Sequence, residues 1–189
     1  MTQYSYTALD LVKKINYNGA NDEIGIVMVK LYKRIQEKIF YKECWQHGDI
    51  AIVHRGVVGN EGITEEHPCD NFEKFESDFI KQYKHQGYAT IPNNEQYLVT
   101  IQLKVRSAQA GIELKNQVTE ALNEKLGWLG LGCVDGFDVD IKKSILGYYN
   151  LEIYCVVVDS DKACNEIKKL MPCAAISDYT ISVHVNTGS

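Results

Sequence analysis

The sequence has no apolar run near the roughly 20 residues that a helix needs to cross a bilayer. Its opening stretch, MTQYSYTALDLVKK, is too polar to be the apolar segment of a secretion signal. Both absences argue against a membrane protein and against a secreted protein. We therefore expect the protein in the cytoplasm, with no membrane as a partner.

Cysteine patterns typical of metal sites are also missing. No two of the six cysteines lie at C-x-x-C spacing, and none has a histidine at zinc-finger distance. We therefore predict no metal and no cofactor. Inside the cell, most of these thiols are expected to be reduced and packed as small hydrophobic side chains. They are Cys44, Cys69, Cys133, Cys155, Cys164 and Cys173.

An excess of positive charge is absent from every part of the chain. The net charge is −5, and Lys plus Arg against Asp plus Glu count 2 to 3 in residues 1–23, 9 to 11 in 24–95 and 9 to 11 in 96–189. Nucleic-acid binding draws much of its affinity from Lys and Arg that neutralise phosphates. This balance argues against such binding without excluding a local basic patch.

What is present is ample material for a core, since 45% of the 189 residues are hydrophobic. After a lead of residues 1–23, whose segment Thr7–Ile15 has the pattern of a short amphipathic helix, we predict a first domain over 24–92. It should contain a helix that Asp70 caps and Gly87 ends. Its three predicted strands are Ile24–Arg34, Ile39–Trp45 and Ile50–Arg55.

A second domain is predicted over residues 96–189, after a linker around Pro92. Its pattern reads strand, helix, strand, strand, helix, strand, which is the order of a ferredoxin-like βαββαβ sandwich. Ser107 is the expected cap of its first helix, whose apolar face carries Ile112, Val118, Ala121, Leu122 and Leu126. The fold class predicted for the whole chain is α+β.

Three evenly spaced glycines, Gly56, Gly59 and Gly62, follow the third predicted strand. Phosphate-binding loops lead from a strand directly into a helix, and here the next helix begins only near Asp70. There is also no G-K-[ST] motif. A turn between strands that uses the freedom of glycine at positive φ is the favoured interpretation.

This glycine frame, with the helix and the later Gly87–Tyr88 pair, resembles the WGR domain. Gly56, Val58, Gly59 and Gly62 match the family frame, while Arg55 and Val57 stand where the tryptophan and arginine of the signature are expected. The resemblance covers roughly residues 29–92 and implies a small antiparallel sheet with a helix packed across it. In poly-ADP-ribose polymerases this domain contacts DNA ends, so the resemblance implies a nucleic-acid role as an alternative function. Its candidate residues are Lys30, Lys33, Arg34, Trp45 and Arg55.

The acidic residues Asp135, Asp138 and Asp140 are the clearest candidates for chemistry in the second domain. Asp138 and Asp140 should share one strand face, where carboxylates can bind a cation or act as acid and base. The favoured interpretation is a solvated strand edge that prevents unwanted sheet pairing. A carboxylate-dependent enzyme or cation binder therefore stays a second alternative.

The face of the second sheet that turns away from its helices is the predicted partner surface. Side chains alternate along a strand, so if Val99, Ile101 and Leu103 are buried, their neighbours must lie on the opposite face. The residues assigned to partner binding are Thr100, Gln102, Tyr154, Val156, Val158 and His184.

No catalytic constellation is visible, so we predict a non-catalytic intracellular binding protein and not an enzyme. Its expected partner is a protein or a second copy of the chain. An acidic chain of this size also suits an immunity or inhibitor protein that neutralises a basic toxin.

Overall fold

The computed structural model describes residues 14–15, 26–140, 147–173 and 178–186. The chain divides into two compact units: unit 1 comprises Met1–Val57 and Gly62–Thr90, and unit 2 comprises Val58–Glu61 and Ile91–Ser189. Helices and antiparallel sheets are combined, which confirms the predicted α+β class. Within the described ranges, no helix is both long enough and apolar enough to span a membrane.

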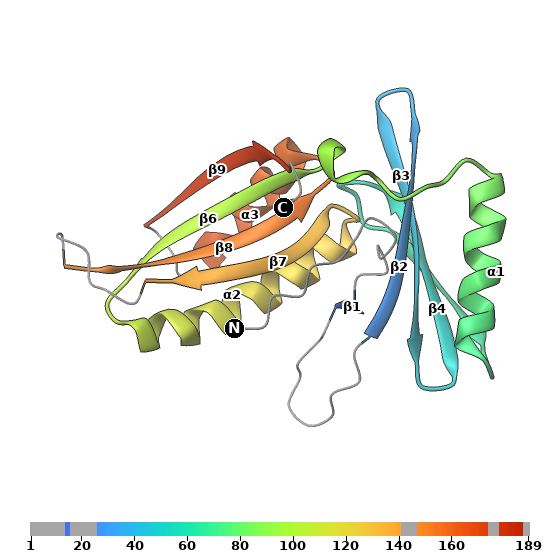
Figure 1. Ribbon diagram of the computed structural model, residues 1–189, viewed down its shortest axis with the longest axis horizontal. Helices are drawn as coiled ribbons and strands as arrows, with labels where there is room; N and C mark the ends of the chain where they lie inside the picture. The colour runs from blue at the N-terminus through green and yellow to red at the C-terminus, as the bar shows by residue number, and fades with distance from the viewer. Residues whose placement is uncertain (1–13, 16–25, 141–146, 174–177, 187–189) are drawn as a thin grey trace. The chain divides into compact units, whose positions relative to one another are not determined.

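Unit 1 is an antiparallel sheet with strand order β1-β2-β3-β4-β5 and one helix, α1, on one face (Figure 1). The elements are β1 (Lys14–Ile15), β2 (Ile26–Ile35), β3 (Lys38–His47), β4 (Ile50–Val57), β5 (Ile63–Pro68) and α1 (Phe72–His85).

Two elements of unit 1 differ from the sequence prediction. The strand β5 was not predicted, because four of its six residues are polar or charged and none of them is buried. It forms by pairing with β4, from Ile50 opposite Pro68 to Arg55 opposite Ile63. The predicted helix over Thr7–Ile15 is wrong at its end, where Lys14 and Ile15 pair with β2. The rest of that segment lies outside the described residues.

The core of unit 1 lies between α1 and the sheet. Val29, Leu31, Cys44 and Val53 are buried against Phe79 of the helix. Further apolar anchors of α1 pack around this cluster, because spacings of three and four place them on one face of the helix. These partly buried anchors are Phe72, Phe75, Ile80 and Tyr83.

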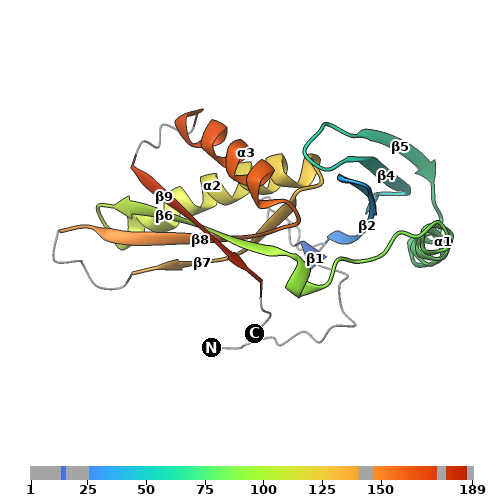
Figure 2. The ribbon, with the colours of Figure 1, turned by 90° about the horizontal axis from the view of Figure 1, so that it is seen from above.

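Unit 2 has the strand order β7-β8-β6-β9, all antiparallel, as a ferredoxin-like sandwich requires. The helices α2 and α3 lie on the same side of this sheet (Figure 2). The elements are β6 (Tyr97–Val105), α2 (Ala108–Trp128), β7 (Gly132–Val139), β8 (Tyr149–Val157), α3 (Ser160–Cys173) and β9 (Tyr179–Val185), with a short 3-10 helix at Asn93–Glu95.

The core of unit 2 follows the predicted alternation along β6. Val99, Ile101 and Leu103 are buried, while Thr100 and Gln102 are half-buried on the opposite face. From α2, the side chains of Val118, Leu122 and Leu126 are buried as predicted. The prediction for Ile112 is wrong, because Gly111 takes the buried position beside Val105 and Val139 and leaves Ile112 exposed.

Buried cysteines belong to both cores. Cys44, Cys69 and Cys155 are buried thiols, as expected from the absence of metal-binding spacing. Burial raises the pKa of Cys44 and that of Cys155 to about 12. These two side chains therefore stay protonated and serve as small hydrophobic groups.

Candidate functional site

In unit 2, α2 and α3 lie on one side of the sheet (Figure 2). Most of the strand residues on the other side are polar. Residues directly opposite each other on neighbouring antiparallel strands share a face. The rows Asp138–Glu152–Gln102–Thr180 and Gly136–Tyr154–Thr100–Ser182 therefore run across all four strands. We call this surface the open face, and it consists of Thr100, Gln102, Lys104, Asp138, Glu152, Tyr154, Thr180, Ser182 and His184.

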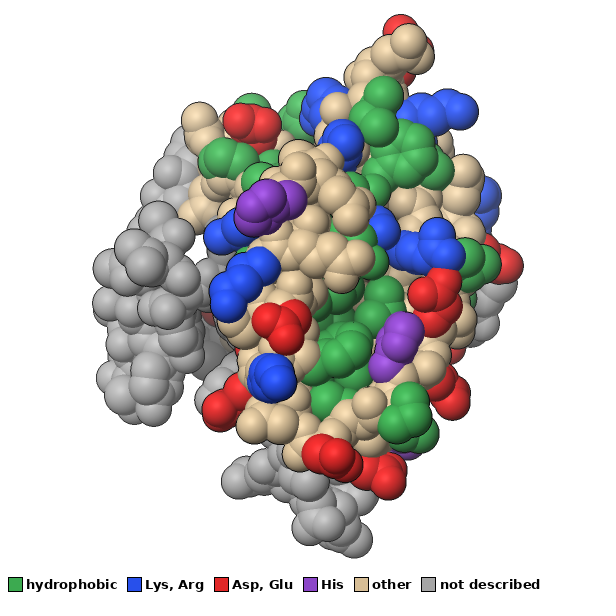
Figure 3. Space-filling view, turned by 90° about the vertical axis from the view of Figure 1, so that its right-hand side faces the viewer, with side chains coloured by type: hydrophobic (Ala, Val, Ile, Leu, Met, Phe, Trp, Pro, Cys, Tyr) green, Lys and Arg blue, Asp and Glu red, His purple; other side chains and the backbone are tan. Residues whose placement is uncertain are grey.

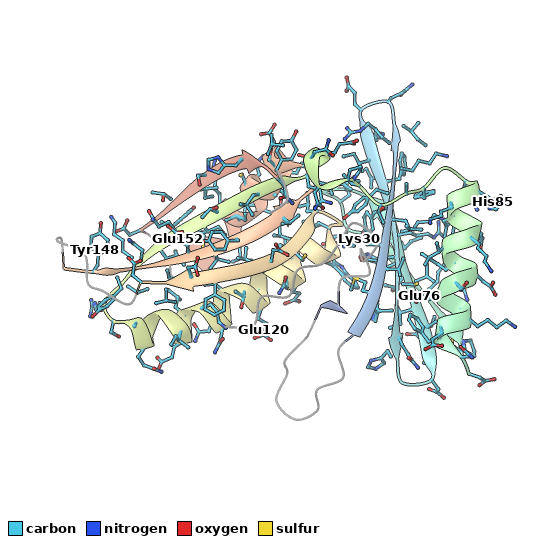
Figure 4. All side chains as sticks on the ribbon, in the orientation of Figure 1. Lys30, Glu76, His85, Glu120, Tyr148 and Glu152 are labelled. Atoms are coloured by element: carbon cyan, nitrogen blue, oxygen red, sulfur yellow. The ribbon has the colours of Figure 1, made fainter. Side chains whose placement is uncertain are left out.

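Tyr154 stands at the centre of a hydrogen-bonded cluster on the open face. Its hydroxyl lies 2.8 Å from the Oδ2 atom of Asp138 and 2.8 Å from the Oε2 atom of Glu152. Gln102 holds Glu152 from the other side, because its amide nitrogen donates to Oε1 at 2.8 Å. Groups from β6, β7 and β8 thus hold the Tyr154 ring in place. Glu152 is labelled in Figure 4.

The protonation of Tyr154 follows from this setting. Burial, the hydrogen bonds to Glu152 and Asp138, and the charges of these two carboxylates all raise the pKa of the tyrosine well above its usual range. The hydroxyl therefore stays protonated, and its single proton is shared between the two carboxylates. The hydroxyl holds the ring in place and is not available as a base near neutral pH.

Negative charge is concentrated around this cluster. Asp140 accepts a hydrogen bond from the Asn150 amide at 2.8 Å, and Asp178 pairs with Lys104 at 3.2 Å. Asp138 on β7 lies opposite Glu152, and Asp140 follows the end of that strand. In the described ranges, no group of three or more His, Cys, Asp or Glu is placed to hold a metal ion.

Two of the residues assigned to partner binding are not accessible. Val156 and Val158 are each only 6% exposed within the chain. Val158 lies just beyond β8, where its backbone N–H donates to the Leu131 carbonyl at 2.9 Å. Alternation alone predicted an open position for both, and it could not show what covers the end of the strand. Neither is part of the open face as we define it.

A second polar cluster lies inside unit 1, on the sheet face away from α1. The ring nitrogens of His54 lie 2.7 Å from Oε1 of Glu43 and 3.0 Å from the Tyr41 hydroxyl. Lys30 forms an ion pair with Oε2 of Glu43 at 2.6 Å. His54, Glu43 and Tyr41 are all buried. We call these four residues the Glu43–His54 cluster.

The hydrogen bonds assign the tautomer of His54. An ionised Glu43 can only accept, so Nδ1 of His54 carries the proton, and Nε2 of the neutral ring accepts from the Tyr41 hydroxyl. Burial, together with the positive charge of Lys30, lowers the pKa of His54 to about 4. Burial also raises the pKa of Tyr41 to about 12. The cluster is therefore a neutral-histidine network at pH 7, in which the ion pair with Lys30 balances the charge of Glu43.

Of the three evenly spaced glycines, two pack against this cluster and one forms a turn. They lie in a hairpin between β4 and β5, so the strand-to-helix geometry of a phosphate loop is absent. Only Gly59 has a positive φ, of 88°. A Cβ on Gly62 would lie 2.3 Å from both the His54 ring and the Tyr41 hydroxyl, and one on Gly56 would lie 3.0 Å from Tyr41. The turn prediction thus holds for Gly59, while the other two glycines allow close packing.

The Glu43–His54 cluster was not predicted from the sequence, although the spacing of the two residues indicates it. Between the second and third predicted strands lies the sequence QHGD, whose composition is typical of a turn. A turn there that pairs His47 with Ile50 places Glu43 opposite His54. A histidine and a glutamate facing each other between two buried strands indicate a polar pair in the interior.

The residues proposed for nucleic-acid binding do not form one surface. Lys30, opposite Glu43, lies on the sheet face away from α1, and strand alternation places Arg34 and Trp45 there too. Lys33 and Arg55 lie on the α1 face, where Lys33 donates to the Gln86 carbonyl and Arg55 pairs with Glu65. Seen from the α1 side, Lys and Arg share the surface with acidic and hydrophobic side chains (Figure 3).

No family model, curated protein or solved structure matches this chain. The functional argument therefore depends on the side chains themselves.

Proposed function

We propose that the chain is a non-catalytic binding protein whose open face binds a basic segment of a partner protein. The observation that carries this proposal is the Tyr154 ring, which Asp138 and Glu152 hold in place. A fixed aromatic ring beside two carboxylates suits a Lys or Arg side chain. The cation gains from the ring face and from the carboxylates together.

The charge around Tyr154 supports a basic partner. Four carboxylates lie on or beside the open face, those of Asp138, Asp140, Glu152 and Asp178. Lys104 is the one lysine among the residues of this face. That lysine is already paired with Asp178 at 3.2 Å. The surplus of negative charge attracts cationic segments over distances up to about 10 Å at ordinary salt.

A more specific form of this proposal is an immunity or inhibitor protein that neutralises a basic toxin. Complementary charge speeds the encounter of two proteins and selects against acidic competitors. The acidic open face and the overall charge of −5 support this form. It belongs to the same binding mode, with the toxin as the source of the basic segment.

A peptide titration tests the proposal. We expect a fluorescein-labelled arginine-rich peptide to bind more tightly than a glutamate-rich peptide of equal length, with an affinity that falls as salt rises. The double variant Asp138→Asn with Glu152→Gln should weaken this binding about tenfold, because it removes two nearby charges.

The matched control removes two exposed carboxylates from α2 instead, through Glu120→Gln with Glu124→Gln; Figure 4 labels Glu120. This control should leave the affinity nearly unchanged. Equal weakening by both double variants would mean that only net charge matters. That result, or binding without preference for the basic peptide, would overturn the proposed site.

A further inference from the structure

The two edges of the unit 2 sheet are built differently. The β7 edge has a register shift between Val134 and Gly136 and carries the exposed carboxylates of Asp135 and Asp138. Bulges and edge charges are the usual means by which proteins prevent a sheet from pairing with another chain. The β7 edge is therefore protected against further pairing.

The β9 edge has none of these features. Its seven residues, YTISVHV, include no Lys, Arg, Asp, Glu or Pro, and β9 pairs with β6 in an unbroken register from Tyr97 opposite Val185 to Leu103 opposite Tyr179. Within the described residues, β6 is the only strand that pairs with β9. An uncharged, regular edge strand is a template for another strand.

Side-chain exposure points to the same edge. Val183 is 42% exposed and Val185 is 55% exposed, although both share a face with Ile181, on the helix side of the sheet. Val99, opposite Val183 on β6, is completely buried. The apolar layer between sheet and helices is therefore complete at β6 and incomplete at β9.

We propose that β9 pairs antiparallel with β9 of a second copy of this chain, about a two-fold axis at Ser182. This register places Ile181 opposite Val183 of the second copy and Tyr179 opposite Val185. It also places Thr180 opposite His184, so apolar residues meet apolar ones and polar residues meet polar ones. The strand is complementary to itself and brings no like charges together.

This self-complementarity favours a second copy over an unrelated peptide. All seven residues of β9 find a partner of the same polarity in the second copy, and none of them is Lys, Arg, Asp or Glu. Pairing would join two four-stranded sheets into one continuous sheet and cover Val183 and Val185. The inference rests on β9 alone and is independent of the proposed peptide binding, because its test contains no peptide.

Sedimentation velocity of the full chain tests the proposal. We expect a wild-type dimer and a monomeric Ser182→Lys variant, whose two lysines would face each other at the two-fold axis. Two facing ammonium groups should raise the dimer dissociation constant by about tenfold or more. Ser182→Glu should have the same effect for the same reason.

Mixing the two variants provides the decisive arm. An equimolar mixture of Ser182→Lys and Ser182→Glu should dimerise again, since opposite charges now meet at the axis. Glu124→Lys on α2 is the matched control and should stay dimeric, and circular dichroism checks that every variant is folded. A monomeric wild type, or a mixture that stays monomeric, would overturn the proposal. So would a folded Ser182→Lys variant that remains as dimeric as the wild type.

Discussion

At the scale of single residues, Gly62 has the most restricted environment among the described glycines of unit 1. The Gly62 Cα lies so close to His54 and Tyr41 that a methyl group would come within 2.3 Å of both polar atoms, and within 2.7 Å of the Arg55 carbonyl oxygen. These neighbours cannot move freely, because both side chains are buried and hydrogen-bonded to each other. A glycine is therefore required here for space and not for a positive φ.

We predict that Gly62→Ala lowers the free energy of unfolding by about 2–4 kcal/mol. The methyl group overpacks the site and separates the Tyr41–His54 hydrogen bond. Chemical denaturation followed by fluorescence measures the loss. Gly127→Ala is the matched control, because its added Cβ would meet no atom within 4 Å beyond the neighbouring backbone of its own helix. Alanine should stabilise α2 slightly. Equal stability of Gly62→Ala and wild type would contradict the packing argument.

His54 gives the protein a defined response to acid. Its pKa is lowered from 6.5 to about 4 in the folded chain, so below pH 6.5 the unfolded chain binds the proton first. The contribution of neutral His54 to stability is fully present above about pH 6.5 and is lost as the pH falls through 4, by about 3 kcal/mol in total. Denaturation over this pH range measures the slope.

The control for the acid response is His54→Gln, which removes the titrating ring. This variant should be less stable at pH 7, since Glu43 and Tyr41 lose their shared partner, but its stability should change less between pH 6.5 and 5 than that of the wild type. If wild type and variant show the same dependence over that interval, His54 is not the group responsible.

At the scale of elements, the N-terminal cap of α1 is one of two neighbouring residues, Asp70 or Asn71. The sequence predicts Asp70, whereas the structure places Asn71 at the cap, where Oδ1 accepts from the Lys74 backbone N–H at 2.9 Å. Both residue types are good caps, so composition could not choose between them. The cap is the residue directly before the first helical turn, and because α1 begins at Phe72, that residue is Asn71.

We predict that Asn71→Ala lowers the free energy of unfolding by about 1 kcal/mol. Asp70→Ala, one residue earlier and exposed, should change it by less than about 0.5 kcal/mol. Thermal or chemical denaturation of the two variants in parallel provides the comparison. A larger loss from Asp70→Ala would return the cap to the residue that the sequence predicted.

The elements also show how much of the fold could be predicted from the sequence. The alternation of Val99, Ile101 and Leu103 with polar neighbours, and the aromatic anchors of α1, were predictable because one side of each element is buried. The strand β5 was not, because its six residues include no buried face and gain their structure from β4. The Tyr154 cluster depends on the register among three strands, which hydrophobic spacing alone does not fix.

At the scale of the whole molecule, the distribution of basic residues bears on the nucleic-acid alternative. A DNA-binding surface needs several Lys and Arg side chains on one face, where they can follow the phosphates. In unit 1 the five candidate residues are divided between the two faces of the sheet. Several already have partners: Lys30 pairs with Glu43, Lys33 with Gln86, and Arg55 with Glu65.

We therefore predict weak binding to blunt and nicked DNA duplexes at physiological salt. Residues 24–95 carry 9 Lys and Arg against 11 Asp and Glu, so a phosphate backbone meets no net attraction from this segment. Fluorescence anisotropy with both duplexes, over a range of salt concentrations, is the measurement. Tight binding with a steep salt dependence would contradict the prediction. In that case Lys33→Ala with Arg55→Ala tests the α1 face and Arg34→Ala the other, whereas Lys30 is a poor choice because its removal leaves Glu43 without its cation.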